Sequence, residues 1–486
     1  MLSAGVAVWI LIAWTNLYRF DVPWMDTWCY LSPAATGGAP FHLETPLLGT
    51  FAGADHTWGL HFPAAQLIYS VYFALLHFDP EWAVAMFILF WLALGVGVGW
   101  SVLRLTGSRL WAAVAIALVL ADRSVFAVAL GQRPEFIASL ALLVAVMALA
   151  GLEPFRGGLR LIAAACAFAV LATAHPVTLL VGAGVCLAMA LYLRSHPGRN
   201  WRLFACSAAG YIIGVAMLFL WFGLQPEAWS AFCDHSAGNW VPFSFGSAFW
   251  RSLKEFYYPT LTGHVMWALA CLVATYSLWT KALKTELPLR AMTVCSLFLI
   301  LCIIAQQKFY NGYYLSIGVP VVVMLVAVFG SETVACIEDS RLQLVVKIAV
   351  CTFVVLHGAF WFTRTLKYVA SGCPDVRKEL AQVVARLPNS RRILIPEVLW
   401  EVAIADPQRY SMNTLPYHAS LQRRRAYESY AYGQLRTGDL VVIDRLQSNR
   451  PLNRLDGGGW ALVGTYTHLL PGRTEWGYDL SVWRKL

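Results

Sequence analysis

Charged residues are scarce in this chain. They make up 13% of its 486 residues, roughly half the share in an ordinary soluble protein, whereas hydrophobic residues make up 59%. A soluble protein of this length could bury a core without so apolar a composition. The apolar residues also come in long blocks, several of them close to the ~20 residues that a helix needs to cross a bilayer. The shortage of charge therefore predicts a polytopic α-helical membrane protein.

The sequence also lacks the motifs of nucleotide-driven and hydrolytic enzymes. It contains no P-loop, no dinucleotide-binding glycine fingerprint, no H-E-x-x-H and no G-x-S-x-G. Its 11 cysteines include no C-x-x-C pair, so the common zinc and thioredoxin-like patterns are missing. Basic segments with interleaved aromatic residues are missing too, and we expect no nucleic-acid partner. These absences disfavour an ATP-driven machine. A cytoplasmic nucleotide-sugar enzyme is disfavoured for another reason, since the polar clusters described below lie on the predicted external side.

The loops between the apolar blocks differ in charge. Twelve Lys and Arg residues gather in alternate short loops on one side, and the intervening short loops carry few. Since basic loops remain in the cytoplasm, we predict a multi-pass protein of the cytoplasmic (inner) membrane, with its N-terminus inside and its C-terminal part outside. The first block lacks a basic start and a clear cleavage site and is interpreted as a retained helix. The candidate spans, about eleven in all, are 1–17, 82–103, 109–127, 134–151, 159–174, 177–193, 203–224, 263–280, 290–306, 313–330 and 345–363.

One further apolar segment, 59–78, is ambiguous. If it crossed the membrane, every later loop would change sides and the twelve basic residues would face outward. We therefore predict an interfacial or partly re-entrant helix there, within a first external loop at 18–81. Its His61, Gln66 and Tyr69 suit an interface better than bare lipid.

The C-terminal part, 364–486, is much richer in charge, with 18 Lys and Arg and 11 Asp and Glu residues. We predict that it is an extracytoplasmic soluble α/β domain, preceded by a transmembrane domain at 1–363. Its basic surface is either solvated or in contact with anionic membrane lipids. From the local patterns we expect a helix at 375–387, with Pro374 in its first turn, and strands at 392–395, 440–443, 460–466 and 478–483.

Acidic residues follow the first predicted helix. Ionisable groups at helix ends carry much of the function of membrane proteins, and an acid in this place can act as a general base on a hydroxyl or hold a divalent cation. The alternative is an ordinary solvated or capping acid. Asp26 is the favoured base because it lies between Trp24 and Trp28 at the membrane boundary, whereas Asp21 is closer to the helix end. The same loop also carries Asp55, His56 and His61.

Cations begin two later helices on the predicted external side. Arg133 and Glu135 bracket a proline at the start of one helix, and a guanidinium can bind a phosphate with its planar fork of donors. The alternative is an Arg133–Glu135 surface pair. Lys308 precedes another helix that starts near Tyr313, and it is either a phosphate ligand or an interfacial anchor.

Taken in order, these motifs resemble the GT-C superfamily of integral membrane glycosyltransferases, which includes protein O-mannosyltransferases and aminoarabinose transferases. Asp26-Thr27-Trp28-Cys29-Tyr30 is similar to the family's D-E-x-x-Y pattern, with Thr27 in place of the second acid. Residues 59–63 lie where many members have a Lys-Pro-Pro-like run. Arg133-Pro134-Glu135 resembles the R-P-D/E of the second external loop, and 308–320 resembles the late R/K-Y-x-x-x-x-x-P segment. The layout, including a C-terminal soluble domain, matches over the whole chain.

The resemblance implies transfer of a hexosyl or pentosyl group outside the cytoplasmic membrane, with inversion. The donor would be a polyprenyl-phosphate sugar, and the acceptor a hydroxyl of a glycan, a lipid or a protein. Asp26 would be the general base, while Arg133 and Lys308 would stabilise the charge that grows on the departing lipid phosphate. The resemblance implies no definite cofactor, and a divalent cation is left open. The remaining candidate substrate-binding residues are Asp21, Asp55, His56, His61, Glu135 and Tyr313.

Three other functions compete with this interpretation. An O-antigen-type polymerase or ligase would favour a large loop between helices over a folded tail. A transporter or flippase of lipid-linked or envelope substrates would show internal repeats, broken helices and charges near the bilayer midplane. A membrane scaffold without catalytic activity would need only a binding tail. The polar clusters at helix ends on one side favour the enzyme.

Overall fold

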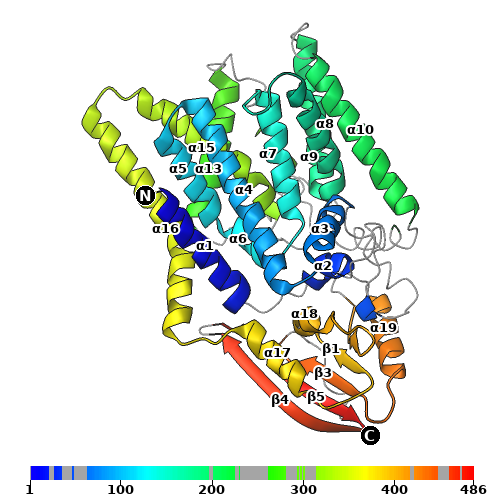
Figure 1. The fold of residues 1–486 in the computed structure, drawn as a ribbon. Helices are drawn as coiled ribbons and strands as arrows, with labels where there is room; N and C mark the ends of the chain where they lie inside the picture. The colour runs from blue at the N-terminus through cyan, green and yellow to red at the C-terminus, as the bar shows by residue number, and fades with distance from the viewer. Residues whose placement is uncertain are drawn as a thin grey trace.

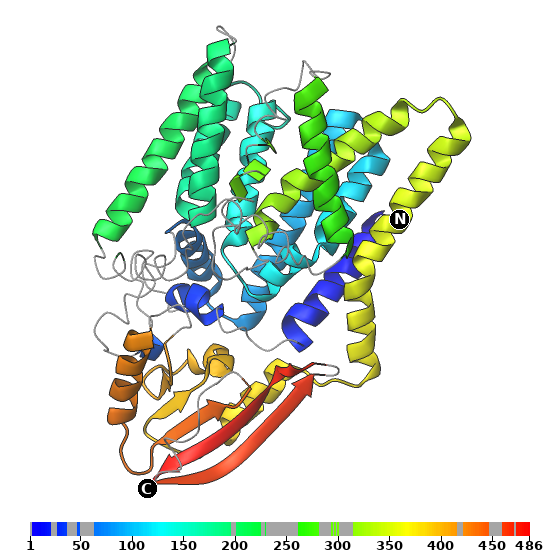
Figure 2. The same cartoon turned by 180° about the vertical axis from the view of Figure 1, so that it is seen from behind.

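The chain is described by a computed structural model, in which a helical bundle ends on a small α/β unit (Figure 1). Seen from either side, the sheet and the C-terminus lie at one end of the bundle (Figures 1 and 2). The residues that the structure describes are 2–20, 27–35, 46–48, 63–195, 201–224, 229, 261–280, 293–294, 296–297, 299–300, 314–415, 421–446, 459–470 and 473–486.

The bundle helices follow the apolar blocks of the sequence. Every predicted span except 290–306, of which only a few residues are described, coincides with a helix. Among the described residues, five helices are long and apolar enough to cross a membrane, or six if the bent pair α5 and α6 is one span. The helices are α1 (Leu2–Trp14), α4 (Pro80–Thr106), α5 (Arg109–Ala121), α6 (Arg123–Leu130), α7 (Glu135–Ala150), α8 (Gly157–Ala174), α9 (Pro176–Ser195), α10 (Trp201–Gly223), α13 (Leu261–Thr280), α15 (Leu315–Ala335) and α16 (Ser340–Ala370).

Local sequence signals decide where these helices begin and end. Asp79 caps α4 by accepting from the backbone N–H of Glu81, Pro80 occupies the first turn, and Gly107 ends the helix with a left-handed φ of 68°. The predicted span 109–127 is interrupted at Asp122, where α5 and α6 meet at an angle of 47°. The Asp122 carboxylate caps α6 there by accepting from the N–H groups of Ser124 and Val125.

The first predicted loop contains a π-helix, η1 (Thr15–Phe20), α2 (Thr27–Ala35), a short 3-10 turn, η2 (Pro46–Leu48), and α3 (Pro63–Leu76). Figure 1 shows α2 and α3 at the end of the bundle that faces the sheet. With 14 residues, α3 spans about 21 Å, less than the ~30 Å of a hydrocarbon layer.

The α/β unit contains a five-stranded sheet in the order β2-β1-β3-β5-β4, in which β1 runs parallel to β2 and β3, and β5 runs antiparallel to β3 and β4. The four predicted strands are present, and β2 is additional. The predicted helix is α17, although Asp375 is its N-cap and Pro374 precedes it. α16 continues through the predicted boundary at 363/364 as far as Ala370. The elements are α17 (Val376–Arg386), β1 (Ile393–Ile395), η5 (Glu397–Leu399), α18 (Trp400–Ala403), β2 (Tyr410–Met412), α19 (Leu421–Gly433), β3 (Leu440–Asp444), β4 (Trp460–Leu470) and β5 (Arg473–Lys485).

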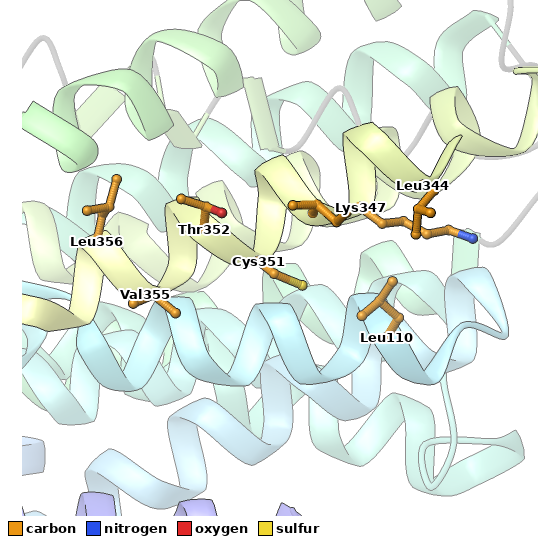
Figure 3. Close-up of a pocket in the computed structure, with 8 residues that line it drawn as sticks. Leu110, Leu344, Lys347, Cys351, Thr352, Val355 and Leu356 are labelled. Atoms are coloured by element: carbon orange, nitrogen blue, oxygen red, sulfur yellow. The ribbon is translucent and has the colours of Figure 1, made fainter. Parts of the chain in front are cut away.

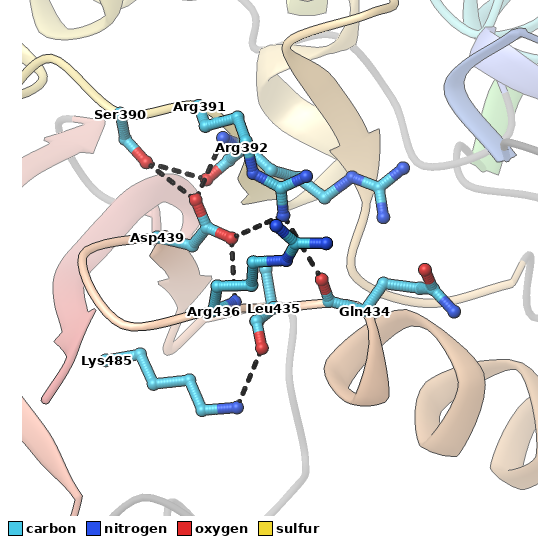
Figure 4. A network of polar contacts seen from close by, with 8 residues as sticks. All are labelled: Ser390, Arg391, Arg392, Gln434, Leu435, Arg436, Asp439 and Lys485. Carbon is cyan, nitrogen blue, oxygen red and sulfur yellow. Dashed lines mark hydrogen bonds and ion pairs between the residues drawn. The ribbon is translucent and has the colours of Figure 1, made fainter.

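Asp439 joins the two turns that lead into the inner strands β1 and β3 (Figure 4). Its carboxylate accepts from the backbone N–H of Arg436 at 2.8 Å and of Arg392 at 3.2 Å, and from the Arg391 guanidinium at 3.1 Å. Burial by itself would raise the pKa of Asp439, but these hydrogen bonds outweigh burial and hold the pKa below its usual range. The ionised carboxylate therefore fixes the start of β3 against the start of β1.

Candidate functional site

Helix α2 begins directly after Asp26 and packs against the turn that precedes α7. The Thr27 hydroxyl donates to the carbonyl oxygen of Gly131 at 3.4 Å, and the Arg133 guanidinium lies 5.3 Å from the centre of the Tyr30 ring. Thr27 and Tyr30 belong to the first acidic motif of the sequence, and Gly131 and Arg133 belong to the second. The fold thus brings together two motifs that are about a hundred residues apart in the chain.

The turn itself has an unusual backbone. α6 ends at Gly131, and Gln132 adopts a left-handed φ of 47°, which reverses the chain so that the N–H of Arg133 bonds back to Val128. A non-glycine residue in this region stores about 1–3 kcal/mol of strain. A side chain at position 131 would lie 2.9 Å from the Arg133 side chain. Glycine at this position therefore lets Arg133 fold back against the turn.

Arg133 and Glu135 form a buried ion pair. The Arg133 Nε and Nη2 atoms lie 3.0 and 2.9 Å from Glu135 Oε1, and the two side chains are 3% and 0% exposed. The pair that the sequence offered as an alternative does form, but in the interior. A buried pair is costly to break from one side, because the remaining charge has no partner. The pair therefore fixes the guanidinium plane beside α2.

His175 lies on the other side of Glu135, in the turn between α8 and α9. Its Nε2 is 3.9 Å from Glu135 Oε1, and its Nδ1 accepts from the N–H of Val177 at 3.2 Å. Burial lowers the pKa of His175 to about 4, although Glu135 opposes this shift. The ring is therefore neutral at pH 7, and it adds no positive charge beside Arg133.

The start of α15 contacts the same cluster. The His175 and Tyr314 rings are 5.0 Å apart, and the Ser139 hydroxyl on α7 bonds the carbonyl oxygen of Ser316 at 3.3 Å. Tyr314 directly follows Tyr313 in the third predicted motif. Described residues of the first and third motifs therefore lie beside the Arg133–Glu135 pair, which belongs to the second motif.

Several predicted site residues cannot be placed in this cluster. The described residues Thr27, Pro63 and Tyr314 are their neighbours in the chain. The roles of the predicted residues themselves stay predictions. The predicted residues outside the described part of the chain are Asp21, Asp26, Asp55, His56, His61, Lys308 and Tyr313.

The structure adds polar residues to which the sequence assigned no chemistry. Gln66 on α3 donates to the carbonyl oxygen of Tyr30 at 3.0 Å. Tyr69, one turn later, is fully buried. Among the described residues neither its hydroxyl nor Glu135 Oε2 has a hydrogen-bond partner. The i, i+3 spacing of Gln66 and Tyr69 was the available signal, because it places both on one face of α3.

A second buried network holds the bend above this turn. His357 on α16 lies 3.6 Å from the Asp122 carboxylate, and its Nδ1 is 2.8 Å from the hydroxyl of Thr262 on α13. Arg123 lies instead over the Phe360 ring at 4.2 Å. His357 and Thr262 thus connect the capped start of α6 to α16 and α13.

The α/β unit holds the chain just before the first acidic motif. The Arg377 guanidinium on α17 makes two bonds to Glu401, at 2.7 and 3.1 Å, and a third to the backbone carbonyl of Tyr18 in η1, at 2.6 Å. The Tyr18 hydroxyl donates to Glu81 at the start of α4 at 2.9 Å. η1 ends at Phe20, directly before the segment with Asp21 and Asp26. Arg377 therefore links α17 and α18 of the α/β unit to η1, and the Tyr18 hydroxyl extends this link to α4.

An apolar groove of about 490 Å³ lies apart from these polar clusters, between α5 and α16 (Figure 3). Leu110, Ile348, Val355 and Leu356 line it, with Lys347 at one end. Its apolar lining on the outer surface of two spans is suited to lipid chains. Its polar lining residues are Lys347, Cys351 and Thr352, and it lies apart from the three motifs.

No protein-family model and no curated protein matches the sequence. Solved structures do match the fold. ArnT from Cupriavidus metallidurans bound to undecaprenyl phosphate aligns over 98% of this chain and 97% of its own, with a TM-score of 0.62 and 14% identity. Its apo state gives a TM-score of 0.59 at 14% identity, over 99% and 96% of the two chains.

The archaeal oligosaccharyltransferase AglB from Archaeoglobus fulgidus, in complex with an inhibitory peptide and a dolichol-phosphate, is a more distant match. It aligns over 91% of this chain and 69% of its own, with a TM-score of 0.52 and 10% identity. Both proteins are GT-C glycosyltransferases with a polytopic bundle and a C-terminal domain. The predicted fold class is confirmed, and the chain shares the fold of these two proteins, a polytopic helical bundle with a C-terminal domain.

Proposed function

We propose that the chain is a membrane glycosyltransferase that moves a sugar from a polyprenyl-phosphate donor to an acceptor hydroxyl on the extracytoplasmic face. The observation that carries the proposal is the contact of α2 with the turn before α7, which joins the segment after Asp26 to Arg133. The two similar proteins hold undecaprenyl phosphate and dolichol-phosphate in their structures. A lipid-borne donor also suits a reaction outside the cytoplasm, where no nucleotide sugar is available.

In this proposal Asp26 removes the proton of the acceptor hydroxyl as its oxygen attacks the anomeric carbon. The bond between this carbon and the phosphate oxygen breaks on the opposite face, so the configuration inverts. Negative charge grows on the departing lipid phosphate, and a cation already oriented toward it stabilises the transition state. Arg133 and Lys308 are the proposed cations.

Glu135 has a positioning role for Arg133. It bonds two of the guanidinium's five N–H donors through a single oxygen, in a site that excludes water. The neutral His175 ring closes the other side of Glu135. A pre-oriented guanidinium needs little reorganisation when the phosphate charge develops, which is the physical basis of electrostatic catalysis.

The proposal leaves the sugar, the acceptor and a divalent cation open. Among the described residues no group of three His, Cys, Asp or Glu side chains could hold a metal ion. The first-loop acids that could hold such a cation, Asp21 and Asp26 among them, lie outside this part of the chain. Chelation of divalent ions during the assay tests for it directly.

The decisive experiment uses the full chain reconstituted into closed liposomes, in which the two leaflets can be distinguished. A polyprenyl-phosphate sugar labelled on the sugar is added, and release of polyprenyl phosphate is measured with and without lipid and glycan acceptors. Release that requires Asp26 supports the proposal. Movement of the intact lipid-linked sugar between leaflets, without release, would contradict it and favour the flippase interpretation.

A further inference from the structure

Three side chains from three segments of the α/β unit meet at the joint between α16 and α17. Cys373 lies in the short connection between these helices, Glu379 on α17 and His468 on β4. The His468 Nε2 is 3.9 Å from the Cys373 sulfur, and the His468 Nδ1 is 2.7 Å from Glu379 Oε2. Each ring nitrogen therefore has one partner, the sulfur on one side and the carboxylate on the other.

A fourth residue supports the carboxylate. The Tyr478 hydroxyl on β5 donates to the same Glu379 oxygen at 3.3 Å, and the Tyr478 ring lies parallel to His468 at 5.6 Å between ring centres. Burial, followed by the nearby Glu379 charge, raises the pKa of Tyr478, so this hydroxyl keeps its proton and remains a donor. His468 is thus held in one orientation by a carboxylate and by a stacked ring.

This arrangement has the logic of an activated nucleophile. A thiol is weakly reactive until a neighbouring base accepts its proton, and the base works best when a third group orients it. With Nδ1–H directed at Glu379, the Nε2 lone pair faces Cys373. An imidazolium beside a cysteine favours the thiolate, which is the reactive form.

Exposure at the joint allows a small reagent to reach the sulfur. Gly372 and Pro374 are exposed and Cys373 is half-buried, whereas His468 is 9% exposed. The cysteine carries a thiol in this structure. The base is therefore shielded from water while the connection that carries the nucleophile lies at the surface.

We propose that Cys373 is a base-activated thiol that takes a low-molecular-weight disulfide, which makes the joint a site of reversible thiol modification. His468 Nε2 accepts the Cys373 proton as the sulfur forms a bond to one sulfur of the disulfide. The disulfide's own S–S bond breaks, and the departing sulfur leaves as a thiolate that takes up the proton from His468. One disulfide is exchanged for another, so no further oxidant is needed.

Other charged groups near the joint have their own partners. Asp375 on the same connection caps α17 and lies 3.8 Å from Arg19 and 4.0 Å from Lys378. Glu379 from α17 and Tyr478 from β5 face His468, and His468 from β4 faces the sulfur. The titratable groups that face the thiol from α17, β4 and β5 are therefore Glu379, His468 and Tyr478, and His468 contacts the sulfur.

The test measures how fast individual cysteines of the full chain react with an aromatic disulfide, dithiobis-nitrobenzoate, in detergent. The reaction is stopped at intervals by acid, and mixed disulfides are located by peptide mass spectrometry. Cys336, exposed at the end of α15, is the reference within the same molecule. Thermal melting establishes that each variant is folded.

Cys373 should react about tenfold faster than Cys336 near pH 6. Proton transfer to His468 raises the thiolate fraction of Cys373, and this gain outweighs the smaller loss in intrinsic nucleophilicity of a more acidic thiol. The Cys373 rate should also change less with pH between about 6 and 8. His468→Gln and Glu379→Gln should remove the advantage and leave the Cys336 rate unchanged, and Thr467→Val, on the neighbouring position of β4, should preserve it.

Equal rates for Cys373 and Cys336 in the wild-type chain would overturn the proposal. So would a pH profile of Cys373 that parallels that of Cys336, and this outcome needs no variant. A folded His468→Gln chain whose Cys373 reacts at the wild-type rate would show that the imidazole does not activate the thiol.

Discussion

Separate and joint replacement of Arg133 and Glu135 distinguishes a phosphate ligand from a purely structural pair. The two side chains are 3% and 0% exposed, and Arg133 makes contacts of 3.0 and 2.9 Å to one carboxylate oxygen. Glu135→Gln leaves a buried guanidinium without its counter-charge, and Arg133→Met leaves a buried carboxylate. Breaking a buried pair from one side costs about 3–5 kcal/mol. Each single variant should therefore melt well below the wild-type chain.

The double variant Arg133→Met/Glu135→Gln separates the two roles. It leaves no uncompensated buried charge, and such replacements are often neutral in stability, so it should regain most of the lost thermal stability. If Arg133 also contacts the donor phosphate, the double variant loses a charged hydrogen bond of about 1.5–3 kcal/mol. That loss corresponds to about a ten- to hundredfold fall in turnover.

The assay follows thermal unfolding by tryptophan fluorescence in detergent, and release of polyprenyl phosphate at equal amounts of folded protein. Ser139→Ala is the matched control on the same helix, because it removes bonds to the Glu135 and Ser316 carbonyl oxygens without changing a charge. Wild-type turnover in a stable double variant would refute the phosphate role of Arg133. A double variant as unstable as either single one would refute the pairing argument.

Four other outcomes are expected. Asp26→Asn should insert normally and lose about 10²–10⁴-fold in turnover, as for loss of a general base, whereas Asp21→Asn should keep much of its activity; the opposite result would assign the base to Asp21. Arg377→Met should lower kcat more than it raises the donor KM, because it loosens the chain just before Asp26. Initial rates are measured over a series of donor concentrations in a folded sample, and an unchanged kcat would show that the link is wrong. Asp439→Asn should lower Tm at pH 7 and reduce the fall in Tm below pH ~4. A carboxyl group with a lowered pKa stabilises the fold, and this stabilisation is lost as the pH falls through that pKa. If Tm falls with pH in parallel for the variant and the wild-type chain, this reasoning is wrong. A reporter that is active only outside the cytoplasm should be active when fused after Leu486, and a silent one would reverse the topology.

Helix α4 illustrates what local sequence is able to specify. Its apolar block exceeds the length of a membrane crossing, Asp79 and Pro80 mark its start, and Gly107 marks its end. The strands β3 and β5 were likewise predictable, because β-branched and aliphatic residues alternate or cluster in them. β2 was missed because Tyr410–Met412 is only three residues long and contains no β-branched residue. Its strand character comes from pairing with β1.

The break between α5 and α6 shows where periodicity fails. The apolar block 109–127 is continuous in hydrophobicity, and one aspartate is not enough to end a helix by its propensity alone. In the folded chain Asp122 instead caps α6 and lies 3.6 Å from His357, more than two hundred residues later. The cap hydrogen bonds to Ser124 and Val125 are local, and what periodicity does not reveal is the distant His357 beside the buried carboxylate.

By itself, the sequence determined the membrane class, the order of the helices, the C-terminal α/β unit and the three polar motifs, since each depends on residues close together in the chain. The tertiary structure decided that Arg133 and Glu135 are an interior pair, because α2, α3 and the His175 turn cover them from segments far away in sequence. It also decided that Arg377 holds Tyr18 and that Cys373 meets His468. Burial and pairing of charges depend on which distant segments exclude water, and no local pattern encodes that.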